Sequence, residues 1–280
     1  PAFSSLGSFP PGWGHGGPIS AQGIYAEDLG LILGALKQQA VTRTYLHLNP
    51  MLTSHWQGIP PIPGVRALPR LAHVLDLEGG FPAIWNDRFS ASTRRAIRKA
   101  EHANLTIEWD DTGKFLPLFY DMFMEWAVRR GKKRHLPEGL VRLSNRRREP
   151  LERYQMVVSA FKKACRIYVV SLAGQPVASA IFLYHHQNAI YYRGTSLREE
   201  ANPVRANDLL HRCMIEDASN LGCRYYHMGE SGGVESLMRF KSGFGALPIN
   251  SFDYSIERLP ITPAMKQVDR IIQIVGKLAS

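Results

Sequence analysis

A lysine between two aromatic residues lies near the C-terminal end of the chain, where residues 239–245 are RFKSGFG. Forming an amide from an activated ester or thioester requires a neutral amine and stabilisation of the negative charge that develops on the carbonyl oxygen. Lys241, held between Phe240 and Phe244, would keep a cation in a water-poor cleft, where it can stabilise that oxygen or bind a phosphate. The glycines of the run allow a tight turn and close approach of a substrate to the backbone. A β-turn with an exposed lysine is the alternative.

Further polar residues fall at the ends of predicted strands that could border such a cleft. Glu230 and Ser231 follow the strand that precedes the lysine, and Glu230 could orient an amine, accept its proton or pair with Arg239. Tyr192 and Arg193 end the third strand of a predicted meander. A buried Arg193 needs a carboxylate or phosphate partner, because an unpaired buried charge is costly.

The usual patterns of metal binding and nucleophilic catalysis are missing from the sequence. His185 and His186 have no further ligands at metal spacing, and neither an HExxH motif nor a Ser-His-Asp arrangement is present. Cys165, Cys213 and Cys223 lack CxxC spacing, so we expect free thiols in a reducing, cytoplasmic compartment. We therefore expect no metal and no covalent nucleophile.

Positive charge is concentrated in one stretch of the 280-residue chain. The formal net charge is +10, and residues 88–166 hold 19 Lys plus Arg against 9 Asp plus Glu, whereas the rest of the chain holds 15 of each. Such a stretch favours a polyanion, bound with an affinity that falls with salt; a solvated surface with arginine stems packed along helices is the alternative. The candidate residues for this contact are Arg94, Arg95, Arg98, Lys99, Arg129, Arg130, Lys132, Lys133, Arg134, Arg146, Arg147 and Arg148.

Composition and periodicity indicate a globular α+β protein of two units. Hydrophobic residues make up 45% and charged residues 21%, and no window of 18 apolar residues predicts a membrane span. Before residue 105 the pattern predicts a Gly- and Pro-rich loop at 1–19, helix 28–39, strand 42–48, a Pro-rich connection at 60–69, strand 72–77 and a helix capped by Ser90 or Ser92. After it we expect strand 105–109, helices after Gly113 and Pro150, a meander within 166–194, a helix from Asn202 to Gly222, strands 224–228 and 251–256, and a final amphipathic helix. The predicted domains are 1–104, completed by 257–280, and 105–256.

Three of these segments resemble one known family. Residues 239–245 resemble the FKxGFG signature of Fem-type transferases and related double-GNAT proteins, in which it follows a strand that ends in a small-residue turn, here 228–231. Residues 85–101, with Arg94, Arg95, Arg98 and Lys99, are similar to a basic helix of that group, and residues 14–18 resemble its Gly-Pro loop. The resemblance implies two GNAT-like domains, mixed sheets flanked by helices, packed side by side, with the last strand and helix returning to the first domain.

One position departs from the family pattern. Bridge-forming Fem-type enzymes commonly place a basic residue just before the Gly-Pro pair, whereas this chain has Gly16 there and His15 one residue earlier. The departure weakens a peptidoglycan precursor as the acceptor, and it favours a small-molecule or peptide amine such as those of natural-product pathways.

The segment before the helix that follows the meander bears on the acyl donor. GNAT enzymes that use acyl-CoA hold its pyrophosphate with a glycine-rich loop at this helix N-terminus. Residues 198–207 contain no glycine, and Glu199 and Glu200 would repel pyrophosphate. Fem-type proteins share this loss and take an aminoacyl group from charged tRNA. Asn207 could present its amide to a substrate or simply cap the helix.

We therefore expect an aminoacyltransferase that moves an aminoacyl group from aminoacyl-tRNA, its co-substrate, to an amine, without a cofactor, in natural-product or cell-wall peptide biosynthesis. The alternatives are an N-acyltransferase that uses acyl-CoA or a carrier-protein thioester, and a non-catalytic double-GNAT module that binds RNA or a partner. In the leading hypothesis the basic residues above contact tRNA, and Lys241 and Glu230 are catalytic. The candidate substrate-binding residues are Phe240, Arg239, Phe244, Ser231, Tyr192, Arg193, Asn207 and His15.

Overall fold

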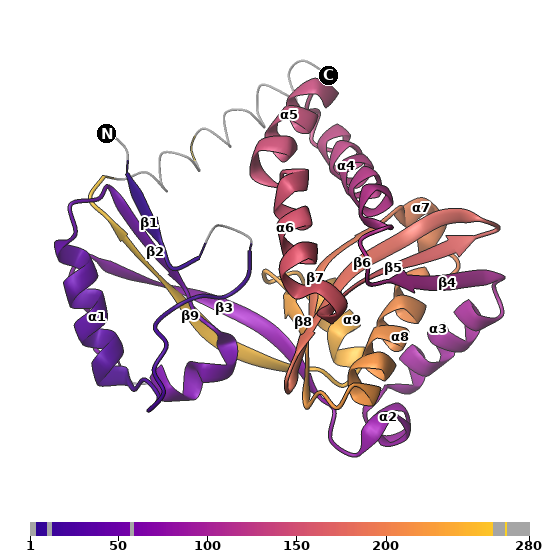
Figure 1. Ribbon diagram of the computed structural model, residues 1–280, viewed down its shortest axis with the longest axis horizontal. Helices are drawn as coiled ribbons and strands as arrows, with labels where there is room; N and C mark the ends of the chain where they lie inside the picture. Colours follow the sequence, from indigo (N-terminus) through magenta and orange to yellow (C-terminus); the bar gives the residue numbers. More distant parts are fainter. Residues whose placement is uncertain (1–3, 10–12, 57–58, 260–266, 268–280) are drawn as a thin grey trace. The chain divides into compact units, whose positions relative to one another are not determined.

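The computed structural model describes residues 4–9, 13–56, 59–259 and 267, and these form two compact units (Figure 1). Unit 1 contains the described residues up to Ala72, together with Glu230–Val234 and those from Pro248 onward. Unit 2 contains His73–Gly229 and Glu235–Leu247. The chain therefore passes from one unit to the other several times.

Unit 1 consists of strands with a helix packed on them. Its strand order is β1-β2-β9-β3, with β1 parallel to β2 and β2 antiparallel to β9. Leu29 and Leu33 of α1 are fully buried and share a core cluster with Leu46 and Tyr254, because the apolar stripe of this helix faces the strands. The elements are β1 Ser5–Gly7, α1 Ala26–Gln38, β2 Arg43–His47, the 3₁₀ helix η1 Pro50–Trp56, β3 Val65–Asp76 and β9 Leu247–Glu257.

Unit 2 contains a mixed sheet in the order β3-β8-β7-β6-β5-β4, to which β3 contributes its last residues, His73–Asp76. Strands β4 to β7 are antiparallel neighbours, which confirms the predicted meander, and β7 is parallel to β8. The strands are β4 Leu105–Asp110, β5 Cys165–Leu172, β6 Gln175–His185, β7 Asn188–Ser196 and β8 Tyr225–Glu230.

Helices cover both faces of this sheet, with α3 and α8 on one face and α4 and α6 on the other (Figure 1). The main core lies under α3 and α8, where Ile97 and Met214 are fully buried together with Val170 and Phe182 of the sheet. The helices are α2 Gly80–Ala83, the π-helix η2 Ile84–Arg88, α3 Ala91–Glu101, α4 Leu116–Lys132, α5 Glu138–Arg148, α6 Leu151–Phe161, the 3₁₀ helix η3 Lys162–Ala164, α7 Arg198–Ala201, α8 Ala206–Asn220 and α9 Glu235–Gly243.

Several sequence predictions are corrected by these elements. The opening segment contains a strand, β1, but its three exposed residues show no alternation that would reveal it. The connection predicted at 60–69 ends before Val65, where strand β3 begins; β3 contains Pro69, whose ring-fixed φ of about −65° is compatible with extended backbone. The helix after the meander begins at Ala206 instead of Asn202, since Arg205 has a left-handed φ of 58° and separates it from α7.

The change of unit also lies elsewhere than the predicted boundary at 104/105. Residues 73–104 belong to unit 2, because Phe89 and Ile97 are buried in its main core. Strand β9 pairs with β2, so the last strand does return to unit 1. The final amphipathic helix, predicted to carry residues 265–278, lies outside the described residues apart from Gln267.

All three cysteines are free, as expected. Among the helices of the described residues, none has both the length and the apolar character that a membrane span requires.

Candidate functional site

Lys241 is buried in unit 2, with only 7% of its surface exposed. It lies in helix α9, and its Nζ donates a hydrogen bond of 2.8 Å to the carbonyl oxygen of Gly229 in β8. The parallel pairing of β7 with β8 covers only Asn188–Ile190 and Tyr225–His227, although both strands continue. Gly229 thus lies past the last paired residues, and Lys241 places a cation where the two strands have parted.

Two buried histidines surround this cation with neutral groups. Burial and then the charge of Lys241 lower the pKa of His73, and the same two causes lower the pKa of His211 to about 3. His211 Nδ1 is 3.0 Å from the hydroxyl of Tyr226, and the ring of Phe240 lies 5.3 Å from the His211 ring. Because these imidazoles stay uncharged at neutral pH, the positive charge of Lys241 can act on a developing negative charge in a water-poor setting.

The glycines of residues 239–245 serve the protein's own packing. The run contains the end of helix α9 and then the expected turn, in which the Gly245 N–H donates to the Ser242 carbonyl oxygen at 2.9 Å. A Cβ on Gly243 would lie 2.5 Å from Thr93 Oγ1, and a Cβ on Gly245, whose φ is +79°, would lie 2.8 Å from the Arg88 carbonyl oxygen. The close approach that the glycines allow is therefore that of the segment 88–93, whose Ser90 N–H donates to the Gly243 carbonyl oxygen.

The aromatic and basic neighbours of Lys241 differ in their surroundings. Phe244 is fully buried and packs edge-on against Phe89, so it belongs to the core and does not border a substrate cleft. Phe240 is half-buried against that core. Arg239 is exposed and pairs with Glu235 at 3.5 Å, instead of with Glu230.

Tyr192 and Arg193 lie at a β-bulge, where Arg193 contacts an internal carboxylate and Tyr192 contacts an arginine that pairs with the same carboxylate. The pairing of β6 with β7 shifts so that Tyr192 has no opposite residue. Arg193 Nη2 donates to Glu149 Oε1 at 3.0 Å, and the Tyr192 hydroxyl accepts from Arg153 Nη2 at 3.0 Å. The partner that Arg193 was expected to need is therefore the protein's own Glu149. Arg153, only 1% exposed, pairs with the same carboxylate.

The segment before α8 is less negative than its sequence indicates. Arg129 pairs with Glu200 at 3.1 Å and with Glu125 at 2.8 Å. The repulsion that was expected to exclude pyrophosphate is thus reduced to Glu199. Asn207 donates a hydrogen bond of 3.2 Å to Ser196 Oγ at the end of β7.

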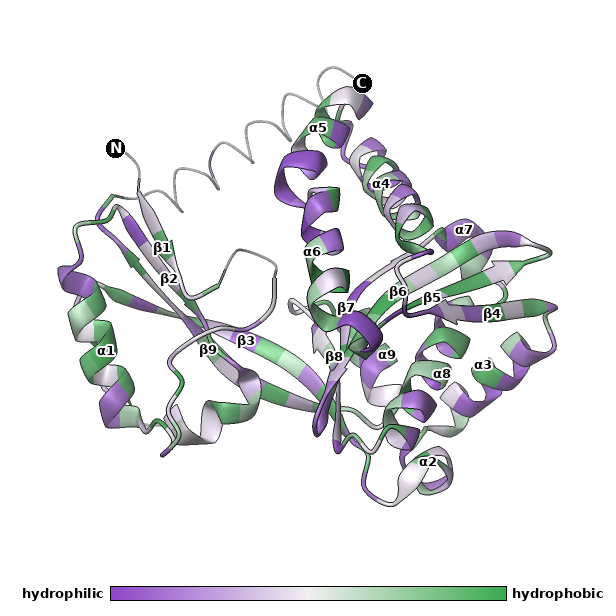
Figure 2. Ribbon diagram, viewed as in Figure 1, coloured by the Kyte–Doolittle hydropathy of each residue, from purple (hydrophilic) through white to green (hydrophobic). Residues whose placement is uncertain are grey.

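The remaining basic residues divide into internal and exposed groups. Arg94 Nη1 donates to the carbonyl oxygens of Trp85 and Asn86 at 3.1 and 2.9 Å, so it caps the π-helix η2. Lys132 pairs with Glu138 at 3.7 Å. Hydrophilic residues cover much of α3 and α5 (Figure 2). Exposed basic side chains without a recorded ion pair among the described residues are Arg95, Arg98, Lys99, Arg130, Lys133, Arg134, Arg146, Arg147 and Arg148.

A cationic group is centred on Arg130 at the end of α4. Burial first, and then the charges of Arg134, Arg198 and Arg193, lower the pKa of Arg130. Arg130 also lies over the Trp126 ring at 5.4 Å. Like charges that close to one another favour an anion between them.

Unit 1 contains a second polar cluster, centred on Asp253, whose side chain is 1% exposed. Its carboxylate accepts hydrogen bonds from His47 Nδ1 at 2.7 Å, from Arg70 Nε at 2.5 Å and from the Tyr45 hydroxyl. Burial alone would raise the pKa of Asp253, but these hydrogen bonds and the nearby positive charges lower it. Burial and then Asp253 raise the pKa of Tyr45 to about 12.

Glu230 and His15 belong to this second cluster. Glu230 lies 3.5 Å from Arg70 and 3.7 Å from His47 Nε2, and the His15 ring stacks on the His47 ring at 4.6 Å. Ring nitrogens of His15 and His47 and a carboxylate oxygen of Glu230 all lie within 4.8 Å of one another, close enough to hold a metal ion. Ser231, next to Glu230, is buried and its N–H donates to the Leu71 carbonyl oxygen.

Sequence reasoning found Glu230 and His15 but missed the residues that position them. Tyr45 and His47 alternate on β2 and so share one face of the strand, which was the available signal. Arg70 and Asp253 gave none, because only strand pairing brings them to His47. The departure at Gly16 has a steric reason: a Cβ there would lie 2.6 Å from the Ser8 carbonyl oxygen, so no basic side chain fits.

Comparisons with known proteins agree with this fold. The model of the acetyltransferase (GNAT) domain matches residues 87–242, more than half of the chain. No functionally curated protein matches the sequence. The crystal structure of FemX is similar with a TM-score of 0.54 and 12% identity, covering 89% of this chain and 79% of that one.

Two further solved structures are similar over most of their length. One is the C-terminal domain of a putative lysylphosphatidylglycerol synthetase from Agrobacterium fabrum, with a TM-score of 0.52 and 15% identity over 88% of this chain and 77% of that one. The other is L-PGS from Bacillus licheniformis, with a TM-score of 0.53 and 14% identity over the same shares. The predicted α+β class and the Fem-type fold are confirmed. The chain belongs to the family of GNAT acyltransferases.

Proposed function

We propose that this acyltransferase moves an aminoacyl group from aminoacyl-tRNA to an amine. The new C–N bond forms as the amine attacks the ester carbonyl, the bond from that carbonyl to the tRNA ribose oxygen breaks, and the amine releases its proton to the leaving oxygen or to water. One of the similar structures is named as a domain of a putative lysylphosphatidylglycerol synthetase, and lysyl is an aminoacyl group, which supports an aminoacyl rather than an acetyl donor.

The unpaired cations near the two ends of helix α5 are the observation that supports this donor most. Arg130, Lys133 and Arg134 lie at the end of α4 and just beyond it, near the start of α5, whereas Arg146–Arg148 end α5. An eleven-residue helix is about 16 Å long. Cations at both of its ends match an extended polyanion, whereas a single pyrophosphate would need one compact site.

The start of α8 supports the same donor. It has no glycine loop to hold pyrophosphate, and Arg205, at the N-cap position, has the left-handed conformation that glycine usually adopts. This arrangement disfavours acyl-CoA without relying on the charge of Glu200.

Lys241 is the proposed catalytic residue. Its bond to Gly229 fixes the ammonium group where β7 and β8 part, beside the neutral His73 and His211. A cation fixed before the reaction stabilises the oxyanion without reorganisation. Removing one such donor costs about 10²–10³ in turnover in a comparable hydrolase.

A transfer assay tests the donor. Charged tRNA and acetyl-CoA are each offered with a panel of amines, and products are identified by mass spectrometry. We expect an aminoacylated amine from tRNA and none from acetyl-CoA. Acetylation without aminoacyl transfer would instead identify the acyl-CoA-dependent alternative.

A binding assay distinguishes residues that bind tRNA from residues that catalyse the transfer. Arg130→Gln, Lys133→Gln and Arg134→Gln combined should weaken tRNA binding and reduce its salt dependence by about one unit of slope per lost phosphate contact. Arg142→Gln is the matched control, because Arg142 is held by Glu138 at 2.8 Å. Lys241→Met should lower turnover about 10²–10³-fold while tRNA binding persists. Salt-independent binding contradicts the tRNA proposal, and unchanged turnover in Lys241→Met contradicts the role of the lysine.

A further inference from the structure

We propose that His15, His47 and Glu230 form a site for a transition-metal dication, with zinc as the best chemical match. The site lies within unit 1, and the proposal uses no step of the proposed aminoacyl transfer. It gives His15 and Glu230 a role other than substrate binding and proton transfer. The absence of a metal motif in the sequence does not bear on it, because the three residues come from separate segments.

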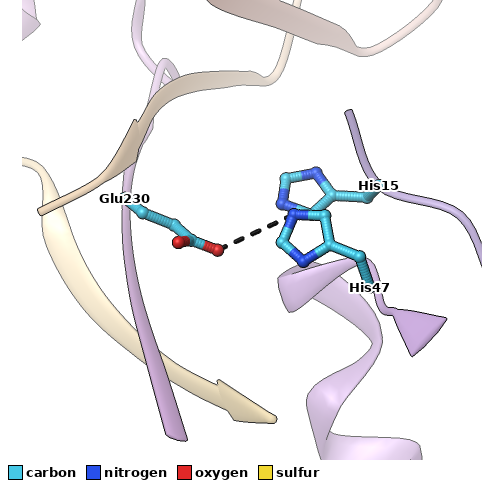
Figure 3. A group of neighbouring side chains, drawn as sticks. All are labelled: His15, His47 and Glu230. Atoms are coloured by element: carbon cyan, nitrogen blue, oxygen red, sulfur yellow. Dashed lines mark ion pairs between the residues drawn. The ribbon is translucent and has the colours of Figure 1, made fainter. Parts of the chain in front are cut away.

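The side chains present their ligand atoms to a common point. Figure 3 shows the two imidazole rings one over the other, with a nitrogen of each on the side that faces the Glu230 carboxylate. His47 Nε2 is 3.7 Å from Glu230 Oε1, and all three ligand atoms lie within 4.8 Å of one another. Tetrahedral ligands at zinc bond lengths of about 2.0–2.2 Å lie about 3.3–3.5 Å apart, so an ion needs to draw these atoms together by at most about 1.5 Å.

His47 is oriented as metal-binding histidines usually are. Its Nδ1 lies 2.7 Å from Asp253, so Nδ1–H donates to the carboxylate and the lone pair of Nε2 points at Glu230. Tyr45 and Arg70 in turn fix Asp253. A carboxylate on the distal ring nitrogen fixes the tautomer and increases ligand basicity, which is the common second layer of zinc sites.

Glu230 is oriented in the same manner. Arg70 Nη1 lies 3.5 Å from Oε2, and Oε1 is the atom that faces His47. The guanidinium opposes a dication, but it is shared between Glu230 and Asp253. The two carboxylates and one guanidinium therefore leave a net negative charge around the proposed ion.

The backbone holds His15 in place beside His47. The next residue, Gly16, donates to the His47 carbonyl oxygen at 2.7 Å and forms a parallel bridge with Leu48. Ser8 Oγ accepts from the His47 N–H at 3.0 Å. The stacked rings are thus positioned by main-chain contacts on both sides, which reduces the entropy lost when a metal binds.

The ligand set selects the metal class. Two imidazoles and one carboxylate match zinc and disfavour calcium and magnesium, which prefer oxygen ligands. Three protein ligands leave a fourth position, which in catalytic zinc sites holds water or a substrate atom.

Zinc binding to the full chain tests the proposal. Metal-free protein is titrated with Zn²⁺ against a chromophoric chelator, and Co²⁺ is added separately to record the visible absorption of a tetrahedral complex. We expect one ion per chain. His15→Ala and His47→Ala should each weaken binding at least tenfold, and Asp253→Asn should weaken it about 10–100-fold through His47.

The control is a second histidine pair. His185 and His186 are exposed with ring centroids 4.1 Å apart, so their double alanine variant should bind zinc as the parent does. Circular dichroism would report whether an alanine variant has unfolded. In that case Glu230→Gln, which preserves the side-chain shape, is the variant that tests the site. The proposal is overturned if no zinc binds, if binding is unchanged in His15→Ala and His47→Ala, or if it is lost with His185 and His186 instead. None of these outcomes alters the transfer assay.

Discussion

Replacing Glu149 by alanine should be among the most damaging single changes in unit 2. The carboxylate is 14% exposed and accepts from Arg153 at 2.5 Å, from the Tyr154 hydroxyl at 2.7 Å and from Arg193 at 3.0 Å. Arg153 is only 1% exposed, so the change leaves a buried guanidinium without this partner. Breaking a buried pair from one side costs about 3–5 kcal/mol, because the remaining charge stays desolvated.

An exposed ion pair gives the comparison for this loss of stability. Glu138 contacts Arg142 at 2.8 Å and is 45% exposed, and such surface pairs contribute about 0–1 kcal/mol. Urea unfolding followed by circular dichroism should therefore show a midpoint about 1–2 M lower for Glu149→Ala, given a slope of about 3 kcal/mol/M, and a nearly unchanged midpoint for Glu138→Ala.

A double variant separates charge burial from packing. Glu149→Gln combined with Arg153→Met removes both charges and retains most of the volume, and we expect it to recover most of the lost free energy of unfolding. The reasoning is refuted if Glu149→Ala costs no more than Glu138→Ala. It is also refuted if the double variant is less stable than Glu149→Ala. In that case the buried charge of Arg153 would not be the cause of the lost stability.

Three further perturbations follow from the geometry of unit 2. Burial lowers the pKa of His211 to about 3, with Lys241 adding to the effect, and burial lowers the pKa of His227 to about 4. Below about pH 6.5 the unfolded chain therefore binds more protons than the folded chain, so the free energy of unfolding should fall as the pH is lowered, by up to about 1.4 kcal/mol per pH unit for each histidine. His211→Gln should reduce this slope in urea titrations at several pH values. Gly243→Ala should lower the free energy of unfolding by about 1–3 kcal/mol, because the added Cβ would lie 2.5 Å from Thr93 Oγ1. In a Thr93→Ala background the same change should be neutral or stabilising. An equal cost in both backgrounds would contradict the steric argument. Ser90→Ala should cost about 1 kcal/mol in thermal unfolding, because Ser90 Oγ accepts from the Thr93 N–H at the start of α3, whereas Ser92→Ala, inside the helix, should cost less.

Local signals in the sequence were sufficient for most elements. The helix cap was predicted at Ser90 or Ser92 and is Ser90, and the alternation in residues 166–194 gave the meander within two residues at each end. Helix α9 was missed because its nine residues follow two glycines and end in another, which indicates a turn when taken alone. The turn does form, but only at residues 244–245, after the helix has packed Gly243 against Ser90 and Thr93.

The candidate sites were predictable only as separate residues. The requirement for an Arg193 partner followed from the cost of burying a charge, but nothing local could identify Glu149, which is 44 residues away in sequence. His47 and Asp253 are 206 residues apart and meet because β2 pairs with β9. Strand pairing over such separations has no signal in a single sequence, so the whole cluster around Asp253 went unrecognised.

The basic residues of 88–166 form two groups, one paired within the protein and one exposed. Arg94 and Arg153 are internal, and Arg129 pairs with two carboxylates, so their charges are already balanced or used by the fold. A polyanion can gain little from them, because it would first have to displace a partner. The exposed cations at the two ends of α5 have no such cost, and neither do Arg95, Arg98 and Lys99 of α3, so the salt dependence of any RNA binding should come from these two sets of exposed residues. An experiment that neutralised all basic residues together would mix loss of stability with loss of binding, whereas substitutions confined to α5 and the end of α4 separate the two.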